Sequence, residues 1–278
     1  MLKQDVYTLL CHRDMDMASV TLPKILKFLK ADQKLIIFDD DSFTTTDINW
    51  CLSLSEKVEV ITFSDRNSIV SEELKNYPNC LKYRRELPLA FKLLDIPIIA
   101  KKGGNRFTFT DTDILYLKNC EHYFSRDVNT YLKTDSIKIS VRLQHVFMKY
   151  KWRVPFKFNS GYFSFDLHEF DLDFLEYYLG LSDIRNTPWL SEQTAWALLF
   201  ARSGNSYCPD ENQFICREKF DGPSESTLAI HLIGKENKYK YENWAEPVGD
   251  VDMEAKFYKS RNVTKLDWIK KTAARLFT

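Results

Sequence analysis

Two aspartates, Asp111 and Asp113, stand on either side of a single threonine, directly after the strand-like stretch RFTFT at 106–110. Residues two apart in an extended chain point to the same side, so both carboxylates face one point. Like charges that close repel each other unless a proton or a cation lies between them. Because Mg²⁺ and Mn²⁺ prefer carboxylate oxygens, the pair is a candidate site for a divalent cation.

An Asp-x-Asp tripeptide has two other interpretations. It can be a structural pair that caps a helix or a turn, or it can supply the nucleophile and the acid of a haloacid-dehalogenase-type phosphatase. The phosphatase motif requires threonine or valine where this chain has Leu115, and it follows the first strand of its fold, whereas at least three predicted strands precede Asp111 here. A second acidic stretch at 39–41 fails the same test at Phe43. The structural and the cation-binding interpretations both stay open at this point.

Strands and helices alternate through the first half of the chain. Buried strands are predicted at 6–12, 34–41, 58–63 and 106–111, with helices at 18–31, 46–56 and 87–102 between them. This alternation predicts a mostly parallel sheet that helices cover on both faces. Ligands bind outside the carboxyl ends of the strands in such sheets. Aspartates stand at two of those ends, at 39–41 and at 111–113.

The second half of the chain is less regular. Strands are predicted at 135–143, 156–166 and 228–234, and helices at 171–181 and 191–204, the latter ending at Gly204. The chain contains no internal repeat, low-complexity tract or linker. A single domain with two functional halves is therefore expected.

The composition argues against several classes of partner. Lysine plus arginine and aspartate plus glutamate number 39 each among 278 residues, so no overall field favours nucleic acid. No run approaches the ~20 apolar residues of a membrane-spanning helix, and the first residues lack the apolar stretch of a secretory signal. The six cysteines form no Cys-x-x-Cys pair and show no zinc-ligand spacing. Reduced thiols in a cytoplasmic protein are expected.

Three further motifs follow the aspartate pair in a fixed order: FNSGYFSFD at 158–166, SEQTAWALL at 191–199 and IHLIG at 230–234. With this order and spacing the chain resembles the GT-A nucleotide-sugar transferases, and especially the family that includes bacterial lipopolysaccharide galactosyl- and glucosyltransferases and glycogenin. The resemblance covers roughly residues 6–238. It implies one GT-A domain over 1–278, an α/β fold with a Rossmann-like, mostly parallel sheet. Within it, 1–118 would bind the nucleotide sugar, 119–254 would form a smaller acceptor-side half, and 255–278 would be a basic helix.

The resemblance also implies a metal centre of Mn²⁺ or Mg²⁺. Asp111 and Asp113 match its carboxylate ligands, with Asp111 also reaching the donor ribose, and His231 matches its third ligand. The diphosphate would lie near Gly234, held by Lys235 or Lys238. The chain departs from the family here, because the family's lysine falls six residues after the histidine, where this chain has asparagine.

Other matches concern the transferring sugar of the donor and the acceptor. Asn159 and Gly161 match residues beside the transferring sugar, although a glycine there is also typical of a β-bulge. Glu192 and Gln193 match an acid–glutamine pair that contacts donor sugar and acceptor, although an acid also suits the first turn of a helix.

Two further donor contacts are expected on looser grounds. Lys92 lies where the family places a basic residue that binds the donor sugar and phosphate, but its leucine-rich helix favours a solvated charge. One of Asp39, Asp40 and Asp41, in the first place Asp39 or Asp41, would read the uracil edge, as in inverting relatives. Capping of a helix by Asp41 or Ser42 is the alternative.

These matches predict a metal-dependent glycosyltransferase that moves a hexose from a nucleoside diphosphate, in the first place UDP, to a hydroxyl of a saccharide or glycan acceptor. The later motifs favour retention of configuration, while the acidic stretch at 39–41 is typical of inverting enzymes. An inverting transferase and a catalytically inactive carbohydrate-binding module on the same scaffold are the alternatives. A nucleotidyltransferase would carry a glycine-rich motif after the first strand, and this chain has none. The family's members point to cell-surface polysaccharide biosynthesis.

The C-terminal tail, 256–278, carries seven basic residues and one acid, Asp267. Leu266, Ile269, Ala273 and Leu276 recur at helical spacing within it. A basic amphipathic helix can lie on an anionic membrane, or it can pack on its own domain. The tail therefore predicts either a packed terminal helix or peripheral contact with the cytoplasmic face of a membrane.

Overall fold

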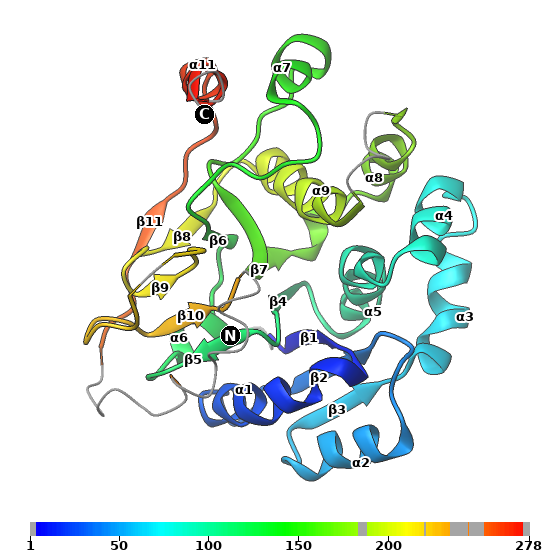
Figure 1. Cartoon of the computed structure of the whole chain (residues 1–278). Coiled ribbons are helices and arrows are strands. Elements are labelled where there is room, and N and C mark those ends of the chain that lie inside the picture. Colours follow the sequence, from blue (N-terminus) through cyan, green and yellow to red (C-terminus); the bar gives the residue numbers. More distant parts are fainter. Residues whose placement is uncertain (1–3, 183–187, 220, 234–243, 245–252, 275–278) are drawn as a thin grey trace.

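The computed structural model describes residues 4–182, 188–219, 221–233, 244 and 253–274 (Figure 1). An eight-stranded sheet crosses the molecule in the order β11-β8-β6-β7-β4-β1-β2-β3. Its first half is parallel and comprises β1 (Val6–Leu10), β2 (Leu35–Asp39), β3 (Val58–Ile61) and β4 (Arg106–Thr110). The fold class predicted from the sequence is confirmed, with β1, β2 and β4 ending at the same edge.

The other half of the sheet is mixed. The long strand β7 (Phe158–Asp166) runs antiparallel to β4 and to β6 (Thr130–Lys133), and β6 runs parallel to β8 (Tyr207–Pro209). The edge strand β11 (Phe257–Lys259) is antiparallel to β8. Between Tyr131 and Leu132 the register of β6 against β7 jumps from Phe163 to Asn159, so β7 bulges around Gly161.

A second, three-stranded sheet lies beside the carboxyl end of β4. Its order is β5-β10-β9, with β5 (Ile114–Tyr116) antiparallel to β10 (Ala229–His231) and β9 (Phe214–Ile215) parallel to β10. Because β5 begins directly after Asp113, this small sheet brings residues near 230 to the aspartate pair.

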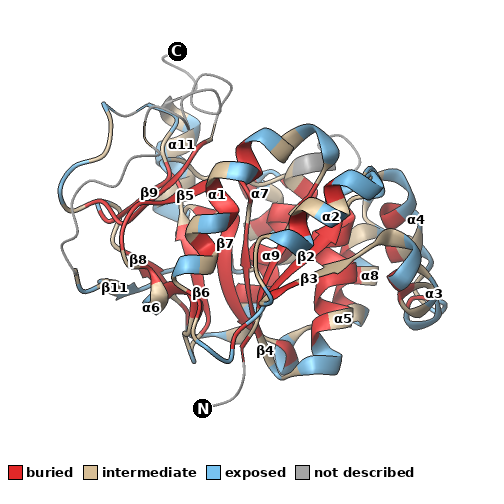
Figure 2. Cartoon of the chain, turned by 90° about the horizontal axis from the view of Figure 1, so that it is seen from below, coloured by how far each residue is buried: buried red, intermediate tan, exposed pale blue. Residues whose placement is uncertain are grey.

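Helices cover both faces of the large sheet (Figures 1 and 2). In the first half these are η1 (His12–Asp14), α1 (Met15–Lys27), α2 (Thr45–Ser53), α3 (Phe63–Glu73), α4 (Pro78–Glu86), the π-helical turn η2 (Phe91–Asp95) and α5 (Ile96–Gly103). In the second half they are α6 (Glu121–Phe124), α7 (Leu143–His145), the π-helical turn η3 (Val146–Tyr150), η4 (Leu167–Glu169), α8 (Leu172–Leu179), α9 (Pro188–Ser203) and α11 (Lys265–Ala274). Among the described helices, none is long and apolar enough to cross a membrane.

Local sequence explains several helix ends. Thr44 with Asp47 and Thr62 with Asp65 form capping boxes that start α2 and α3, so Asp41 and Ser42 are not the caps of α2. Helix α9 ends at Ser203, before Gly204 in the left-handed region with φ of 88°, as the sequence predicted.

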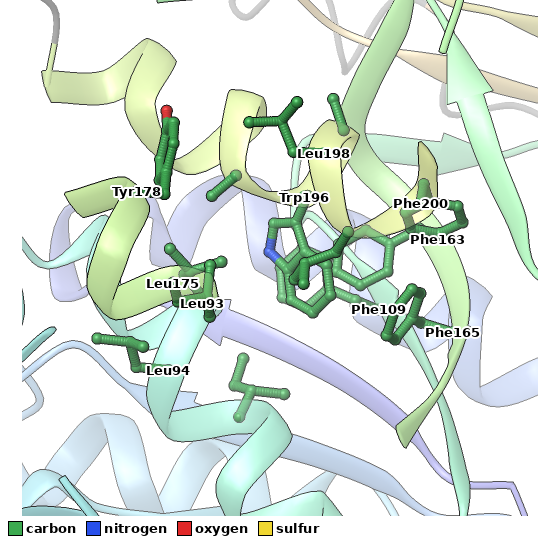
Figure 3. Packing of buried hydrophobic residues seen from close by; sticks show 14 of the residues in the cluster. Leu93, Leu94, Phe109, Phe163, Phe165, Leu175, Tyr178, Trp196, Leu198 and Phe200 are labelled. Carbon is green, nitrogen blue, oxygen red and sulfur yellow. The ribbon is translucent and has the colours of Figure 1, made fainter. Parts of the chain in front are cut away.

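Two buried clusters lie on the two faces of the sheet. The larger one centres on Trp196 of α9, whose ring lies 4.4 Å from that of Phe163 on β7 (Figure 3). The rings of Phe165 and Phe200 pack in the same cluster, with their centroids 5.0 Å apart. Burial of these aromatic side chains is worth roughly 1.5–3 kcal/mol each. It holds α9, and with it Glu192 and Gln193, against the middle of β7.

Some predicted elements are wrong or incomplete. Residues 135–142, all described, form no strand, and the strand of this region is β6, which ends at Lys133. The predicted helix at 87–102 is instead a π-helical turn followed by α5. Helices α3 and α4 and the strands β5, β8, β9 and β11 were not predicted. These strands have two or three residues each, which is too short for a periodic pattern.

A buried charge network joins the helices to the end of β2. The carboxylate of Asp95 accepts hydrogen bonds from Arg66 Nε at 2.8 Å and from Arg84 Nε at 2.7 Å. All three side chains are buried, and Arg66 also donates to the backbone carbonyl of Asp39 at 2.7 Å. The network therefore fixes η2, which carries Asp95, relative to the loop that follows β2.

We expect Asp95→Asn to lower the free energy of unfolding by about 3–5 kcal/mol, because it leaves two buried guanidinium groups without their counter-charge. Glu59→Gln is the matched control, since Glu59 pairs with Lys34 at 3.1 Å with nearly half of each side chain exposed, and it should cost less than about 1 kcal/mol. Urea unfolding followed by circular dichroism measures both. Equal effects of the two substitutions would contradict the structural role of the network.

Candidate active site

The structure brings together the three residues predicted to bind a metal. Asp111 follows β4 and donates its backbone N–H to the carbonyl of Gly161 at 2.7 Å. His231 Nε2 lies 3.0 Å from Asp113 Oδ1 and 3.8 Å from Asp111 Oδ2. Potential ligand atoms of all three residues lie within 4.8 Å of one another. Two carboxylates and one imidazole are a suitable donor set for Mn²⁺ or Mg²⁺.

The small sheet holds His231 in this position. His231 pairs with Ile114 across β10 and β5, and the backbone N–H of Leu232 donates to the carbonyl of Asp113 at 2.9 Å. The other ring nitrogen, Nδ1, lies 3.5 Å from Sγ of the buried Cys216. Cys216 thus contacts the far side of a predicted metal ligand, a position where an outer partner fixes the orientation of the ring. Nothing in its sequence context indicated this contact.

The neighbouring carboxylates influence whether His231 is protonated. Burial is the largest single influence and acts to lower its pKa, but the Asp113 carboxylate and Cys216 together outweigh burial and raise the pKa of His231 to about 10. A proton on the imidazole therefore offsets the aspartate charges when no metal ion is bound. This cluster attracts positive charge, as expected for a cation site.

Gly161 provides the room for the imidazole. A Cβ at this position would lie 2.2 Å from His231 Cε1 and 2.6 Å from His231 Nδ1, well inside any permitted contact. It would also lie 2.9 Å from Asn159 Oδ1. The β-bulge interpretation of this glycine is confirmed, and the close approach that it permits in the structure is that of His231; contact with the transferring sugar stays a prediction.

Lys92 is buried beside the aspartate pair, so the preference for a solvated charge is wrong. Its side chain is 3% exposed, and its Nζ lies 3.0 Å from Asp111 Oδ1 and 3.3 Å from Ser160 Oγ. The ammonium also lies 4.4 Å from the centre of the Phe109 ring, within cation–π distance. The π-helical turn η2 points Lys92 at the site, where sequence periodicity alone placed it on an exposed helix face.

Glu192 faces Lys92 from the first turns of α9. Its Oε1 lies 3.8 Å from Lys92 Nζ, and its Oε2 accepts a hydrogen bond from Ser160 Oγ at 3.0 Å. Burial raises the pKa of Glu192 to about 7, while Lys92 acts to lower it. Ser160, the variable position of the Phe-Asn-x-Gly motif, was not predicted, and it bridges Lys92 and Glu192.

Asn159 and Gln193 lie next to each other at the same place. Asn159 Oδ1 accepts the backbone N–H of Gly161 at 2.8 Å, and its Nδ2 lies 3.5 Å from Gln193 Oε1. Gln193 Nε2 donates to the carbonyl of Lys138 at 2.8 Å. The motifs at 158–166 and 191–199 therefore meet, and the amide groups of both residues have defined orientations.

A cavity of about 650 Å³ opens beside this cluster. Residues from the carboxyl ends of β1, β2 and β4 and from the loop before η2 form its walls: Leu9, Cys11, His12, Arg13, Asp14, Asp40, Ser42, Leu87, Pro88, Leu89, Lys92, Asp111, Thr112 and Asp113. Its position and size suit a nucleotide sugar.

The acidic stretch after β2 contributes to this cavity through Asp40 and Ser42. Asp39 Oδ1 accepts backbone N–H groups from residues 41, 42 and 43 at 2.8–3.0 Å, so it holds the loop. Asp41 is exposed at a φ of 80° and is absent from the described cavity walls. Gly234, Lys235 and Lys238 lie outside the residues that the structure describes.

Comparison with known proteins identifies the fold. No family model and no curated protein sequence matches the chain. Mouse xyloside xylosyltransferase 1 aligns over 85% of this chain and 99% of its own, with a TM-score of 0.55 and 11% identity. An active-site mutant of LgtC aligns over 87% of this chain and 95% of its own, with a TM-score of 0.52 and 8% identity. The glycosyltransferase GlyE of Streptococcus pneumoniae TIGR4 aligns over 88% of this chain and 60% of its own, with a TM-score of 0.51 and 11% identity. This chain therefore spans less than two thirds of the length of GlyE. The chain therefore has the GT-A glycosyltransferase fold, which confirms the resemblance at the level of fold.

We expect Gly161→Ala to displace His231 from the aspartate pair, because the added methyl group and the imidazole cannot occupy the same space. Mn²⁺ affinity should fall at least tenfold, the effect typical of disturbing a ligand's orientation. Electron paramagnetic resonance titration with Mn²⁺ measures this loss. Gly103→Ala is the control, since no described atom lies within 4 Å of a Cβ added there. Unchanged Mn²⁺ affinity in Gly161→Ala would exclude His231 as a ligand.

Proposed function

We propose that this protein is a metal-dependent glycosyltransferase that moves a hexose from a nucleoside diphosphate, in the first place UDP, to a hydroxyl of a saccharide or glycan. The observation that carries the proposal is the cluster of Asp111, Asp113 and His231, whose two aspartates line the 650 Å³ cavity. The GT-A fold supports it, because ligands bind outside the carboxyl ends of the strands in open α/β sheets.

The three residues would hold Mn²⁺ or Mg²⁺ between them, and the bound ion would neutralise the diphosphate as it leaves. Lys92 places a second positive charge at the same end of the cavity, 3.0 Å from Asp111. Its hydrogen bond to Ser160 and its ion pair with Glu192 hold the ammonium in place. Lys92 would therefore orient the donor phosphate or the transferring sugar.

Asn159, Glu192 and Gln193 are proposed to surround the reacting carbon. Transfer breaks the bond between that carbon and the diphosphate oxygen and forms one to the acceptor oxygen, whose proton must leave. In a retaining reaction the departing phosphate oxygen accepts that proton, and the amides of Asn159 and Gln193 orient the two sugars. Glu192 Oε1 is buried and lies 3.8 Å from Lys92 Nζ.

Metal dependence is the first test. We expect Asp111→Asn and Asp113→Asn each to remove most of the activity while the fold remains intact, because the diphosphate loses its counter-charge. The assay is nucleoside diphosphate release from a panel of UDP- and GDP-hexoses with Mn²⁺, with Asp32→Asn, an exposed acid in a turn, as the control. Full turnover in excess chelator would contradict the proposal.

Stereochemistry is the second test. If the reaction retains configuration, Asn159→Ala and Gln193→Ala should lower turnover by roughly ten- to a thousand-fold, the cost of removing one oriented donor, with donor affinity little changed. If it inverts, a carboxylate must act as base, and Glu192 and Asp166 are the candidates. NMR of the anomeric configuration of the product decides between the two. An inverted linkage would refute retention without affecting the metal site.

A further inference from the structure

A second cavity lies on the acceptor side of the molecule, away from the one that suits a nucleotide sugar. Its volume is about 480 Å³, within the range of ligand sites in proteins. Its walls come from β6, β8 and β11, which lie side by side in the large sheet (Figure 1), and from the loop after β8. Because β4, β6 and β8 run in the same direction, the carboxyl ends of β6 and β8 lie at the same edge of the sheet as the aspartate pair.

Two short connections join this cavity to the residues of the proposed site. Lys133 on the cavity wall pairs, across β6 and β7, with the residue that directly precedes Asn159. Cys216, whose thiol contacts His231, is followed directly by Arg217, which is another residue of the wall. The cavity therefore adjoins the residues proposed to surround the reacting carbon.

The polar groups of the wall hold one another in place. Lys133 pairs with Glu211, and both side chains are partly exposed. Arg217 Nη2 donates to the backbone carbonyl of Glu211 at 3.2 Å and to Asn212 Oδ1 at 3.4 Å. Donors and acceptors thus alternate along the wall, which suits hydroxyl groups, because a hydroxyl both donates and accepts.

An exposed aromatic ring completes this wall. Tyr258 on β11 is 56% exposed, although its backbone pairs with that of the buried Cys208 on β8. Its hydroxyl hydrogen-bonds to the carboxylate of Asp210, which holds the ring in one orientation. The face of an aromatic ring is electron-rich and packs well against the C–H groups on one face of a sugar.

The chain that follows β11 supplies a further wall. The backbone N–H of Phe156 donates to the carbonyl of Arg261 at 2.8 Å, and the guanidinium of Arg261 lies 3.6 Å from the centre of the Phe156 ring. Asp267 binds that guanidinium at 2.7 Å, so its charge is offset within the protein. This part of the C-terminal tail therefore packs on its own domain, and the wall that it forms favours no strongly charged ligand.

We propose that this cavity binds an uncharged saccharide chain, namely the part of the acceptor that lies beyond the sugar receiving the hexose. The alternating donors and acceptors match the hydroxyls of such a chain, and the ring of Tyr258 matches the C–H face of one of its sugars. A nucleic acid would instead require cations that neutralise its phosphates. Saccharide binding stands on the cavity itself, whereas the role of the saccharide as acceptor rests on the proposed function.

Binding is tested on the whole chain, without metal ion or sugar nucleotide. The probes are the uncharged tetrasaccharides maltotetraose, cellotetraose, mannotetraose and lacto-N-tetraose, with tetragalacturonic acid as their charged counterpart. Saturation-transfer NMR should detect binding of at least one uncharged probe, and Tyr258→Ala should raise the Kd of that probe about tenfold. Tyr177→Ala is the matched control, because Tyr177 is 54% exposed on α8, away from the described walls of the cavity. The control should bind like the unchanged protein.

A second variant tests the polar wall. Asn212→Ala/Arg217→Ala should raise the Kd of the same probe about tenfold, since each lost hydrogen bond costs about threefold. The melting temperature should stay unchanged, because neither side chain is buried. Absence of a signal from every uncharged probe, an equal loss in Tyr177→Ala, or binding of tetragalacturonic acid alone would each overturn the proposal.

The role as acceptor has a separate, kinetic test. With the bound tetrasaccharide as acceptor, Tyr258→Ala should raise the KM for the acceptor about tenfold and leave kcat unchanged, because the contact is made equally in the ground and transition states. With a single hexose as acceptor the same variant should behave like the unchanged protein, since one sugar does not reach the cavity. An equal rise for both acceptors, or a fall in kcat, would overturn the acceptor role. Saccharide binding without any transfer would refute the proposed function and leave the binding site standing.

Discussion

The structure depends on holding three carboxylates next to two cationic groups at the carboxyl end of β4. Asp111 and Asp113 would repel each other if nothing offset their charge, and the charge of Asp111 adds to burial in raising the pKa of Glu192. Lys92 and His231 provide that offset, each with a nitrogen 3.0 Å from an aspartate oxygen. Since a histidine must be neutral to bind a metal, occupation of the proposed site would exchange the proton of His231 for a divalent ion.

This constraint explains why a second sheet exists. The aspartates arise at the end of β4, but a histidine can reach them only if another segment lies alongside. Strand β5 begins directly after Asp113 and pairs with β10, so the backbone register sets the position of His231. The bulge of β7 then brings Gly161 beneath the ring, where any side chain would collide with it. Hydrogen bonding of the backbone, more than side-chain packing, therefore determines the geometry of the cluster.

The sequence predicted those parts that depend on local patterns. The four parallel strands and α9 follow from buried runs and helical spacing, while the grouping of His231 with Asp111 and Asp113 was implied by the resemblance to the GT-A transferases. The short strands could not be predicted, because two or three residues carry no period. Lys92 was misjudged since a π-helical turn rotates its side chain away from the face that an α-helix would give it. The contacts of Ser160 and Cys216 result from tertiary pairing across 32 and 15 residues, which local sequence does not reveal.

The same π-helical turn links stability to the site. Within its five residues, Lys92 points to the aspartate pair, while Asp95 points to Arg66 and Arg84 on the helices behind. A π-helical turn is less favourable than an α-helical one and persists where the surroundings stabilise it. The two arginines supply that stabilisation, and Arg66 also holds the carbonyl of Asp39 at the start of the loop that lines the cavity. One buried carboxylate thus sets the position of a proposed donor-binding lysine on one side and of the cavity wall on the other. Replacing a buried ion network by apolar groups is often neutral for stability, so the effect of this network that the structure shows directly is the geometry that it imposes on Lys92 and on the cavity wall.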